Sequence, residues 1–465
     1  MTRTSSTHSS ENMTPKHSRV SLSRRWMAGA AVASLFVLSS CDSAKILEVV
    51  DPDILNPAQI ETGAGAVPLR YGALRDFVVA FDGSGDAFAV VTGNLADELR
   101  ASDTFDGRLL PNKRLMNDNL PEMTSTYVAM HKARSSINNA INVIKVIAPT
   151  PKFNIGELYM YRAYMEDFFG EMYCSGVPFS AVVDGAPVLG TPETTTQVFT
   201  RAAASFDSAL ANADTAKKIL FGAAVGKARA LLNLGQYAAA AAAVAGVPTT
   251  FKLNSDHCLG SGCNENGLYN AAMATSSRYN PANNEGINGL NFLPTVPDPR
   301  LPWIASTRPG FNTDWKNLPI GLKPLRAGNN VLADGIEARL IEAEARLQGK
   351  TQADRDAVFG ILNNLRATGF PGTVIPNLTG AAPATDAAAV TQLFQERAYW
   401  MYLTGHRLGD LRRLIRQYGR DAETVFPTGE EAPPRSGPYG SDVNFPVPAS
   451  EKNNPNFTGC IDRKA

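Results

Sequence analysis

Apolar residues recur at the three- and four-residue spacing of an α-helix through most of the chain beyond residue 120. In the stretch 120–147, for example, Tyr127, Met130 and Ile137 fall on one face, and Pro149 follows the last apolar residue. This spacing predicts an amphipathic helix whose apolar face covers a core. Similar patterns predict further helices, over residues 57–79, 155–173, 194–213 and 222–245.

The stretch 336–365 predicts a hairpin of two helices. Its apolar residues keep helical spacing on both sides of Gly349, a residue type that often ends helices. Thr351 and Asp354 then have the spacing of a capping box, which begins the next helix. Gly235 is placed in a similar way in an earlier hairpin, like the turn of a tetratricopeptide repeat (TPR), although a plain alanine-rich hairpin is the alternative.

A long region over 251–330 interrupts the helical pattern. It is rich in Gly, Asn and Pro, and a loop of this length within a domain is usually functional or disordered. Its frequent aromatic residues favour an ordered segment. An earlier stretch over 81–111 is also rich in Gly and Asp and predicts loops and short strands. The sequence therefore predicts a mainly α protein with few short strands and one large insertion.

The N-terminus has the pattern of an export signal. Residues 1–25 end in Arg24-Arg25, and an uncharged apolar run follows over 27–38, too short for a permanent transmembrane helix. The next residues, Leu38 to Cys41, resemble the lipobox of bacterial lipoproteins, in which the cysteine is lipidated. An ordinary signal with a chance cysteine is the alternative. We expect a signal peptide over 1–40 and an extended tether over 41–60.

The charge balance argues against nucleic acid as a partner. The first 40 residues contain five of the 44 basic residues and one of the 44 acidic residues, so the remainder has 39 bases and 43 acids, a net charge of −4. A mildly acidic chain without a basic cluster lacks the electrostatic footprint of a nucleic-acid-binding protein.

Few residues suit a catalytic or metal site. Only His131, His257 and His406 lie beyond the N-terminal segment. This leaves little for a histidine-based metal site or a Ser-His-Asp triad. The common motifs of hydrolases, metalloproteases and nucleotide-binding proteins are absent from the sequence. We therefore expect no enzymatic activity, no cofactor and no metal.

Four cysteines remain after export into an oxidising compartment, and they allow three pairings. Cys258 and Cys263 flank Leu-Gly-Ser-Gly, which can close a small loop, so we expect a disulfide between them. Cys174 and Cys460 are then the remaining pair. A zinc site is the alternative, but only His257 lies nearby.

The stretch 393–413 combines an apolar pattern with many charges. Taken as one helix it has no plainly polar face, which is typical of a buried helix. Buried charges are tolerated when they are paired and hydrogen-bonded. We therefore expect Glu396 and Asp410 to pair with arginines, among them Arg397, Arg407 and Arg412.

The same stretch resembles a signature of the SusD/RagB family of nutrient-binding outer-membrane lipoproteins. The chain departs from that pattern at Thr404, where the family has Glu, and at Leu408, where it has an aromatic residue. The matching residues are Glu396-Arg397, Gly405-His406-Arg407, Asp410-Leu411-Arg412-Arg413, Pro446-Val447-Pro448, Glu451 and Asn454-Pro455-Asn456. Asp298-Pro299-Arg300 resembles a further structural element of the family.

The resemblance implies one SusD-like domain over 61–465, a superhelical scaffold of TPR-like hairpins with the insertion at 251–330. It also implies a lipid-anchored protein on the outer face of the outer membrane. Its partner there would be a SusC-like TonB-dependent transporter. The protein would capture an oligosaccharide or peptide and pass it to that transporter.

We expect the ligand to contact aromatic and polar residues of the loops. Sugar rings stack on aromatic side chains, while amides, carboxylates and arginines bind hydroxyl groups. The alternative for each aromatic residue is that it anchors the insertion to the helices. The candidates are Trp303, Trp315, Tyr279, Asn94, Asp97 and Arg100.

Two other functions stay open from the sequence. One is a TPR-like assembly scaffold without a small ligand, and the other is a lipid-anchored glycoside hydrolase. No motif favours either of them.

Overall fold

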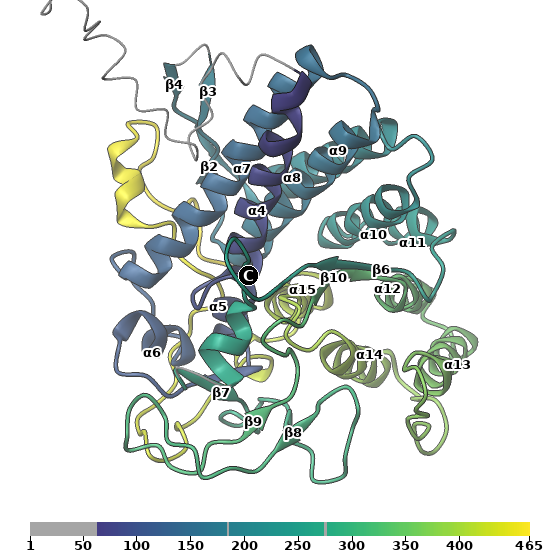
Figure 1. The fold of residues 1–465 in the computed structure, drawn as a ribbon. Helices are drawn as coiled ribbons and strands as arrows, with labels where there is room; N and C mark the ends of the chain where they lie inside the picture. Colours follow the sequence, from purple (N-terminus) through teal and green to yellow (C-terminus); the bar gives the residue numbers. More distant parts are fainter. Residues whose placement is uncertain (1–62, 184–185, 274–276) are drawn as a thin grey trace, which may run out of the picture. The chain divides into compact units, whose positions relative to one another are not determined.

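Antiparallel helices make up most of the computed structural model, which describes residues 63–183, 186–273 and 277–465 (Figure 1). The predicted signal peptide, the candidate lipidation site Cys41 and the tether over 41–60 lie outside these residues. No helix in the described ranges combines the length and the apolar character needed to cross a bilayer.

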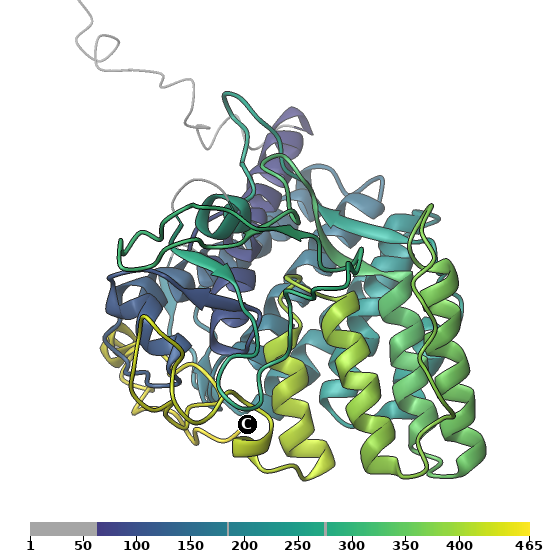
Figure 2. The ribbon, with the colours of Figure 1, turned by 90° about the horizontal axis from the view of Figure 1, so that it is seen from below.

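Most of the helices pack on the next helix in the chain. Apart from short 3-10 and π-helical turns, they are α4 (Ala66–Phe81), α5 (Phe88–Leu95), α6 (Asp106–Asn112), α7 (Pro121–Ile147), α8 (Phe153–Met172), α9 (Thr195–Ala211), α10 (Lys217–Asn233), α11 (Tyr237–Val244), α12 (Gly335–Leu347), α13 (Gln352–Thr368), α14 (Asp386–Trp400) and α15 (Arg407–Tyr418). Successive pairs from α7 to α13 lie against each other, and α14 packs on α12 (Figures 1 and 2). This confirms the predicted scaffold of helical hairpins.

The strands are short and form antiparallel pairs. The pairs are β1 (Leu99–Ala101) with β7 (Tyr279–Pro281), β2 (Val177–Pro178) with β5 (Pro192–Glu193), β3 (Ala181–Val183) with β4 (Ala186–Val188), β6 (Lys252–Ser255) with β10 (Asn330–Asp334), and β8 (Trp303–Ile304) with β9 (Ile320–Gly321). Two of them tie the insertion to the scaffold, because β7 pairs with β1 of the early loops and β6 pairs with β10 directly before α12.

The core centres on α8, which is buried on nearly all sides as its aromatic residues predict. Phe168 stacks on Phe88 with ring centroids 4.2 Å apart and on Phe81 at 5.3 Å. Neighbouring helices approach closely where α8 has glycine: a Cβ on Gly170 would lie 2.6 Å from the ring of Phe199 in α9. Large side chains from α4, α5 and α8 thus fill one continuous core.

The predicted hairpin over 336–365 forms α12 and α13. Thr351 and Asp354 make the capping box, each side chain accepting a hydrogen bond from the other residue's backbone N–H. Gly349 follows the C-cap of α12, but the left-handed residue of this turn is Lys350. Gly349 is required for a different reason, since a Cβ there would lie 2.1 Å from the Asp354 carboxylate.

The prediction of one continuous helix over 393–413 is wrong. The chain forms α14 up to Trp400, turns, and begins α15 at Arg407. Leu403 and Gly405 have positive φ angles of 59° and 82° in the turn, a conformation that a helix cannot contain. A Cβ on Gly405 would also lie 2.7 Å from the ring of Phe88, so the turn packs directly on α5.

Buried ion pairs hold α14 and α15, as their sequence predicts. Arg397 donates two hydrogen bonds, of 2.9 and 3.0 Å, to Asp410. Arg413 donates to the same carboxylate at 2.8 Å and also pairs with Glu344 of α12. Glu396 accepts from Arg300 of the insertion at 2.9 Å. The network therefore joins both C-terminal helices to α12 and to the insertion.

The expectation that Arg407 and Arg412 pair with Glu396 or Asp410 is wrong, because both bind other partners. Arg407 forms a two-bond pair with Asp97, at 2.7 and 2.9 Å, and so holds the early loops against α15. Arg412 donates to the backbone carbonyls of Gly170 and Glu171 at the end of α8.

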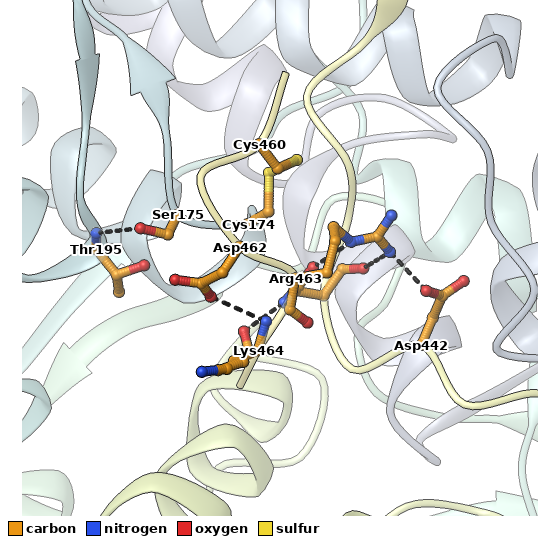
Figure 3. Close-up of a disulfide and its surroundings, with 9 residues drawn as sticks. Cys174, Ser175, Thr195, Asp442, Cys460, Asp462, Arg463 and Lys464 are labelled. Carbon is orange, nitrogen blue, oxygen red and sulfur yellow. Dashed lines mark hydrogen bonds and ion pairs between the residues drawn. A yellow bond between two sulfur atoms is a disulfide. The ribbon is translucent and has the colours of Figure 1, made fainter. Parts of the chain in front are cut away.

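Two disulfides close parts of the chain. The bond between Cys174 and Cys460 joins the end of α8 to the C-terminal segment (Figure 3). Beside it, Arg463 pairs with Asp442 at 2.6 Å, which fixes the last residues against the preceding loop. The other disulfide joins Cys258 to Cys263 within the insertion. His257 next to it pairs with the buried Asp82, 3.0 Å away.

Removing the charge of Asp410 should destabilise the fold strongly. Asp410→Asn leaves the buried Arg397 and Arg413 without their shared carboxylate, which should cost about 3–5 kcal/mol of unfolding free energy. The measurement is urea denaturation. The control is Asp207→Asn, which breaks an exposed pair with Lys227 and should cost less than about 1 kcal/mol. Equal losses in the two variants would contradict a dominant role for the network.

The carboxyl of Glu98 should make the stability depend on pH. Burial, with the nearby charge of Asp97, raises the pKa of Glu98 to about 8, although its carboxylate accepts a 2.9 Å hydrogen bond from the Leu403 N–H. In the folded state Glu98 therefore keeps its proton at pH values above the unfolded pKa of about 4.5. The unfolding free energy falls as the pH rises from that value towards 8. In Glu98→Gln that contribution is absent. The unfolding free energy of the variant should therefore rise relative to the parent from pH 5 to pH 8, whereas a constant difference would refute the assignment.

Candidate functional site

The aromatic candidates from the sequence are mostly buried. Tyr279 lies in β7 with no exposed surface, and Trp315 is only 4% exposed. These two rings pack where the insertion meets the early loops and do not face solvent, which agrees with the alternative that they anchor the insertion. Trp303 in β8 is partly exposed, but its indole Nε1 donates to the Pro294 carbonyl at 3.0 Å within the insertion.

The polar candidates Asn94 and Asp97 also have structural partners. The Asn94 amide donates to the Arg108 carbonyl at 2.8 Å. Both oxygens of Asp97 accept hydrogen bonds from Arg407, and one also accepts from the Leu290 N–H at 2.8 Å. Both side chains are buried, Asn94 within α5 and Asp97 just after its end.

The structure brings three of the six candidates together. Arg100 stacks on Trp315, with its guanidinium carbon 4.3 Å from the ring centroid, and pairs with Glu285 at 3.2 Å. Tyr279 is the strand partner of Ala101, the residue after Arg100. Arg100, Trp315 and Tyr279 lie beneath an exposed surface. Trp303, Asn94 and Asp97 make their contacts elsewhere.

Two exposed phenylalanines lie next to Arg100, Trp315 and Tyr279. Phe105 is the N-cap residue of α6 and is 47% exposed, and Phe311 of the insertion is 43% exposed. Their ring centroids are 6.2 Å apart. Arg278 lies against both rings, its guanidinium carbon 3.9 Å from the centroid of Phe311 and 5.3 Å from that of Phe105. We call Phe105, Arg278 and Phe311 the Phe105–Phe311 patch.

Backbone hydrogen bonds fix the patch to the early loops. The Phe311 N–H donates to the Ser277 carbonyl at 3.0 Å, and the Asn312 N–H donates to the Ser102 carbonyl at 2.9 Å. The Ser102 N–H in turn donates to the Arg278 carbonyl at 2.8 Å. Both rings are therefore held in place from below, although they are exposed.

A buried carboxylate orients the charges under the patch. Asp103 accepts from Arg278 at 2.8 Å and from Arg108 at 3.2 Å. Burial alone would lower the pKa of Arg108, but its hydrogen bond to Asp86, with the charges of Asp86 and Asp103, raises that pKa above its usual value. Arg108 therefore remains a cation that neutralises Asp103.

This arrangement suits the binding of a sugar ring. Exposed aromatic faces and a flat guanidinium offer stacking surfaces for apolar C–H groups, and a guanidinium donates to hydroxyl groups. The described residues contain no group of three or more His, Cys, Asp or Glu side chains placed to bind a metal ion. In the sequence, Phe311 is only one of several aromatic residues of the insertion. Phe105 was not among the candidates, and its one sequence signal is its position between a polar loop and a short helix.

The fold is shared with proteins of the SusD superfamily. A SusD superfamily protein from Bacteroides vulgatus superposes with a TM-score of 0.59 at 14% identity, over 86% of this chain and 98% of that one. A surface glycan-binding protein from Bacteroides uniformis gives a TM-score of 0.60 at 13% identity, over 86% and 99% of the two chains. A SusD-like carbohydrate-binding protein from Bacteroides fragilis gives 0.58 at 13% identity, over 85% and 99%.

These likenesses cover nearly all of the described chain, which has the mainly α SusD-like fold that the sequence resemblance implied. No protein-family model and no curated protein matches the sequence.

Proposed function

We propose that this chain binds an oligosaccharide at the cell surface and that the Phe105–Phe311 patch contacts the sugar. The observation that carries the proposal is the pair of rings, each more than 40% exposed, that flank one guanidinium. Large apolar side chains at fixed exposed positions are common in binding surfaces. Two of the structures that share the fold are glycan- or carbohydrate-binding proteins by name, which agrees with this ligand class.

The proposal includes a lipid anchor and a transporter partner. Cys41 would carry the acyl chains, which hold a protein to a membrane through their buried methylene groups. A SusC-like TonB-dependent transporter in the outer membrane would then receive the ligand, as the resemblance to the SusD/RagB family implies. In this arrangement the chain is a binding protein that delivers a nutrient without changing it.

The chemistry of the patch agrees with binding rather than hydrolysis. Glycoside hydrolysis generally uses two carboxyl groups on either side of the scissile bond. The carboxylate under the patch, Asp103, is buried and already pairs with Arg108 and Arg278. Its role is to orient the cations.

Removing both exposed rings should abolish most glycan binding. The double variant Phe105→Ala/Phe311→Ala loses two stacking surfaces, which together contribute about 1–3 kcal/mol, so the Kd should rise about fivefold to a hundredfold. The measurement is binding to an array of glycans and peptides, followed by calorimetry with the glycan that binds best. Both residues are exposed, so the circular dichroism spectrum and thermal midpoint should change little.

A matched control removes an exposed ring elsewhere. Tyr71 in α4 is 57% exposed and has Arg70 4.9 Å from its ring centroid, so Tyr71→Ala should leave glycan binding unchanged. Glycan binding that survives in the double variant would exclude the patch as the site. Binding of peptides alone would contradict the proposed ligand class, and binding of neither would favour an assembly scaffold.

A further inference from the structure

Arg134 of α7 is a buried cation that lacks a carboxylate partner. Its exposed fraction is 5%. Among the described residues no acidic group lies within ion-pair distance of it, and its buried Nε has no hydrogen-bond partner there. Its contacts are an Nη2 hydrogen bond to the Ser180 carbonyl and the ring of Phe179, whose centroid is 5.3 Å from the guanidinium carbon.

Most other buried arginines of the described chain are paired with carboxylates, whereas Arg412 donates to two backbone carbonyls instead. Arg229 binds Glu337 at 2.8 Å, Arg397 binds Asp410, and Arg407 binds Asp97. A buried charge without a partner is costly, so proteins rarely keep one without a use. Burial lowers the pKa of Arg134 and the charge of Glu166 opposes that shift, but the Glu166 carboxyl already accepts from Ser205 at 2.5 Å and lies 3.6 Å from Arg162.

A cavity of about 770 Å³ opens beside Arg134, between α7 and the strand β3. No acidic residue of the described chain lines it. The polar residues that line it include Arg134, Ser135, Asn138, Asn139, Asn142 and Arg162. Five of these lie on α7 at positions i, i+1, i+4, i+5 and i+8, so they form one row about 12 Å long.

Much of the hydrogen-bonding capacity in this row is unused. The side-chain amides of Asn139 and Asn142 are exposed and make no hydrogen bond with the described residues. Asn138 differs, because its amide oxygen accepts from Arg162 at 3.2 Å and is thereby oriented. Free amide groups beside two cations suit a ligand that has both hydroxyl groups and a negative charge.

We propose that this cavity binds the carboxylate of an acidic saccharide, with Arg134 neutralising the charge and Asn139 and Asn142 binding hydroxyl groups. The cavity is much larger than a small anion requires, which favours a carboxylate attached to a polyol. The site is distinct from the Phe105–Phe311 patch: β3 and β4 lie at the top of Figure 1, and α6 and β7 lie in its lower left half. The inference therefore does not rest on the proposed function.

The test compares three probes with the same protein by calorimetry. They are a tetramer of galacturonic acid, its fully methyl-esterified form, and sodium acetate. The acidic tetramer should bind, and the ester should bind at least about tenfold more weakly, since it lacks the charge. Acetate should also bind more weakly, since it lacks the hydroxyl groups. No binding of the acidic tetramer, equal binding of the ester, or a tetramer that binds no more tightly than acetate would each overturn the proposal.

Variants locate the binding. Arg134→Gln should weaken the acidic tetramer about tenfold to a hundredfold, because it removes the charged donor. The double variant Asn139→Ala/Asn142→Ala should weaken binding of the acidic tetramer several-fold. Both positions are exposed and do not affect the core, so this variant tests the site even if Arg134→Gln fails to fold. Tyr71→Ala removes an exposed ring outside both sites and should leave binding of the tetramer unchanged, and Phe105→Ala/Phe311→Ala reports any binding of the tetramer at the patch. Binding that is lost in the phenylalanine variant and kept in the asparagine variant would place the acidic ligand at the patch and overturn the second site.

Discussion

The pairing of buried arginines with carboxylates is the interaction on which the rest of this structure depends. Arg407 reaches from α15 to Asp97 in the early loops, and Arg397 and Arg413 share Asp410. An unpaired charge in a low-dielectric interior is costly, so each pair favours one arrangement of the elements that supply its members. Helices near the C-terminus thereby fix loops that lie some 300 residues earlier in the chain.

The position of the exposed patch follows from this constraint. Asp97 holds the start of the segment that continues through β1, and β1 pairs with β7 of the insertion. Arg100 lies between Trp315 and Glu285, so the segment and the insertion also meet through a partly buried cation. Phe105 and Phe311 then come from the two sides of this junction. Residues far apart in the sequence share a surface because the buried charges beneath them are paired.

Local signals in the sequence predicted most of the helices, the capping box of Thr351 and Asp354, and the burial of Glu396, Arg397 and Asp410. The expectation of only loops and short strands over 81–111 is wrong, because α5 and α6 form there. Local signals could not predict the break after Trp400, because it depends on the close approach of Gly405 to Phe88. They could not separate the buried Trp315 from the exposed Phe311 either, since both are aromatic residues in one polar loop. The exposed fraction of a ring depends on its tertiary contacts, and here Trp315 is the ring that covers Arg100. The partner of Asp97 was hidden for the same reason, as Arg407 lies 310 positions away.

Contact between the Phe105–Phe311 patch and a sugar ring would be seen in a crystal structure of the protein with a bound oligosaccharide. Ring carbons of the sugar should lie within about 4 Å of the Phe105 and Phe311 side chains, and a sugar hydroxyl group should accept a hydrogen bond from Arg278. A sugar bound at another surface, with both rings still open to solvent, would contradict the proposed contact.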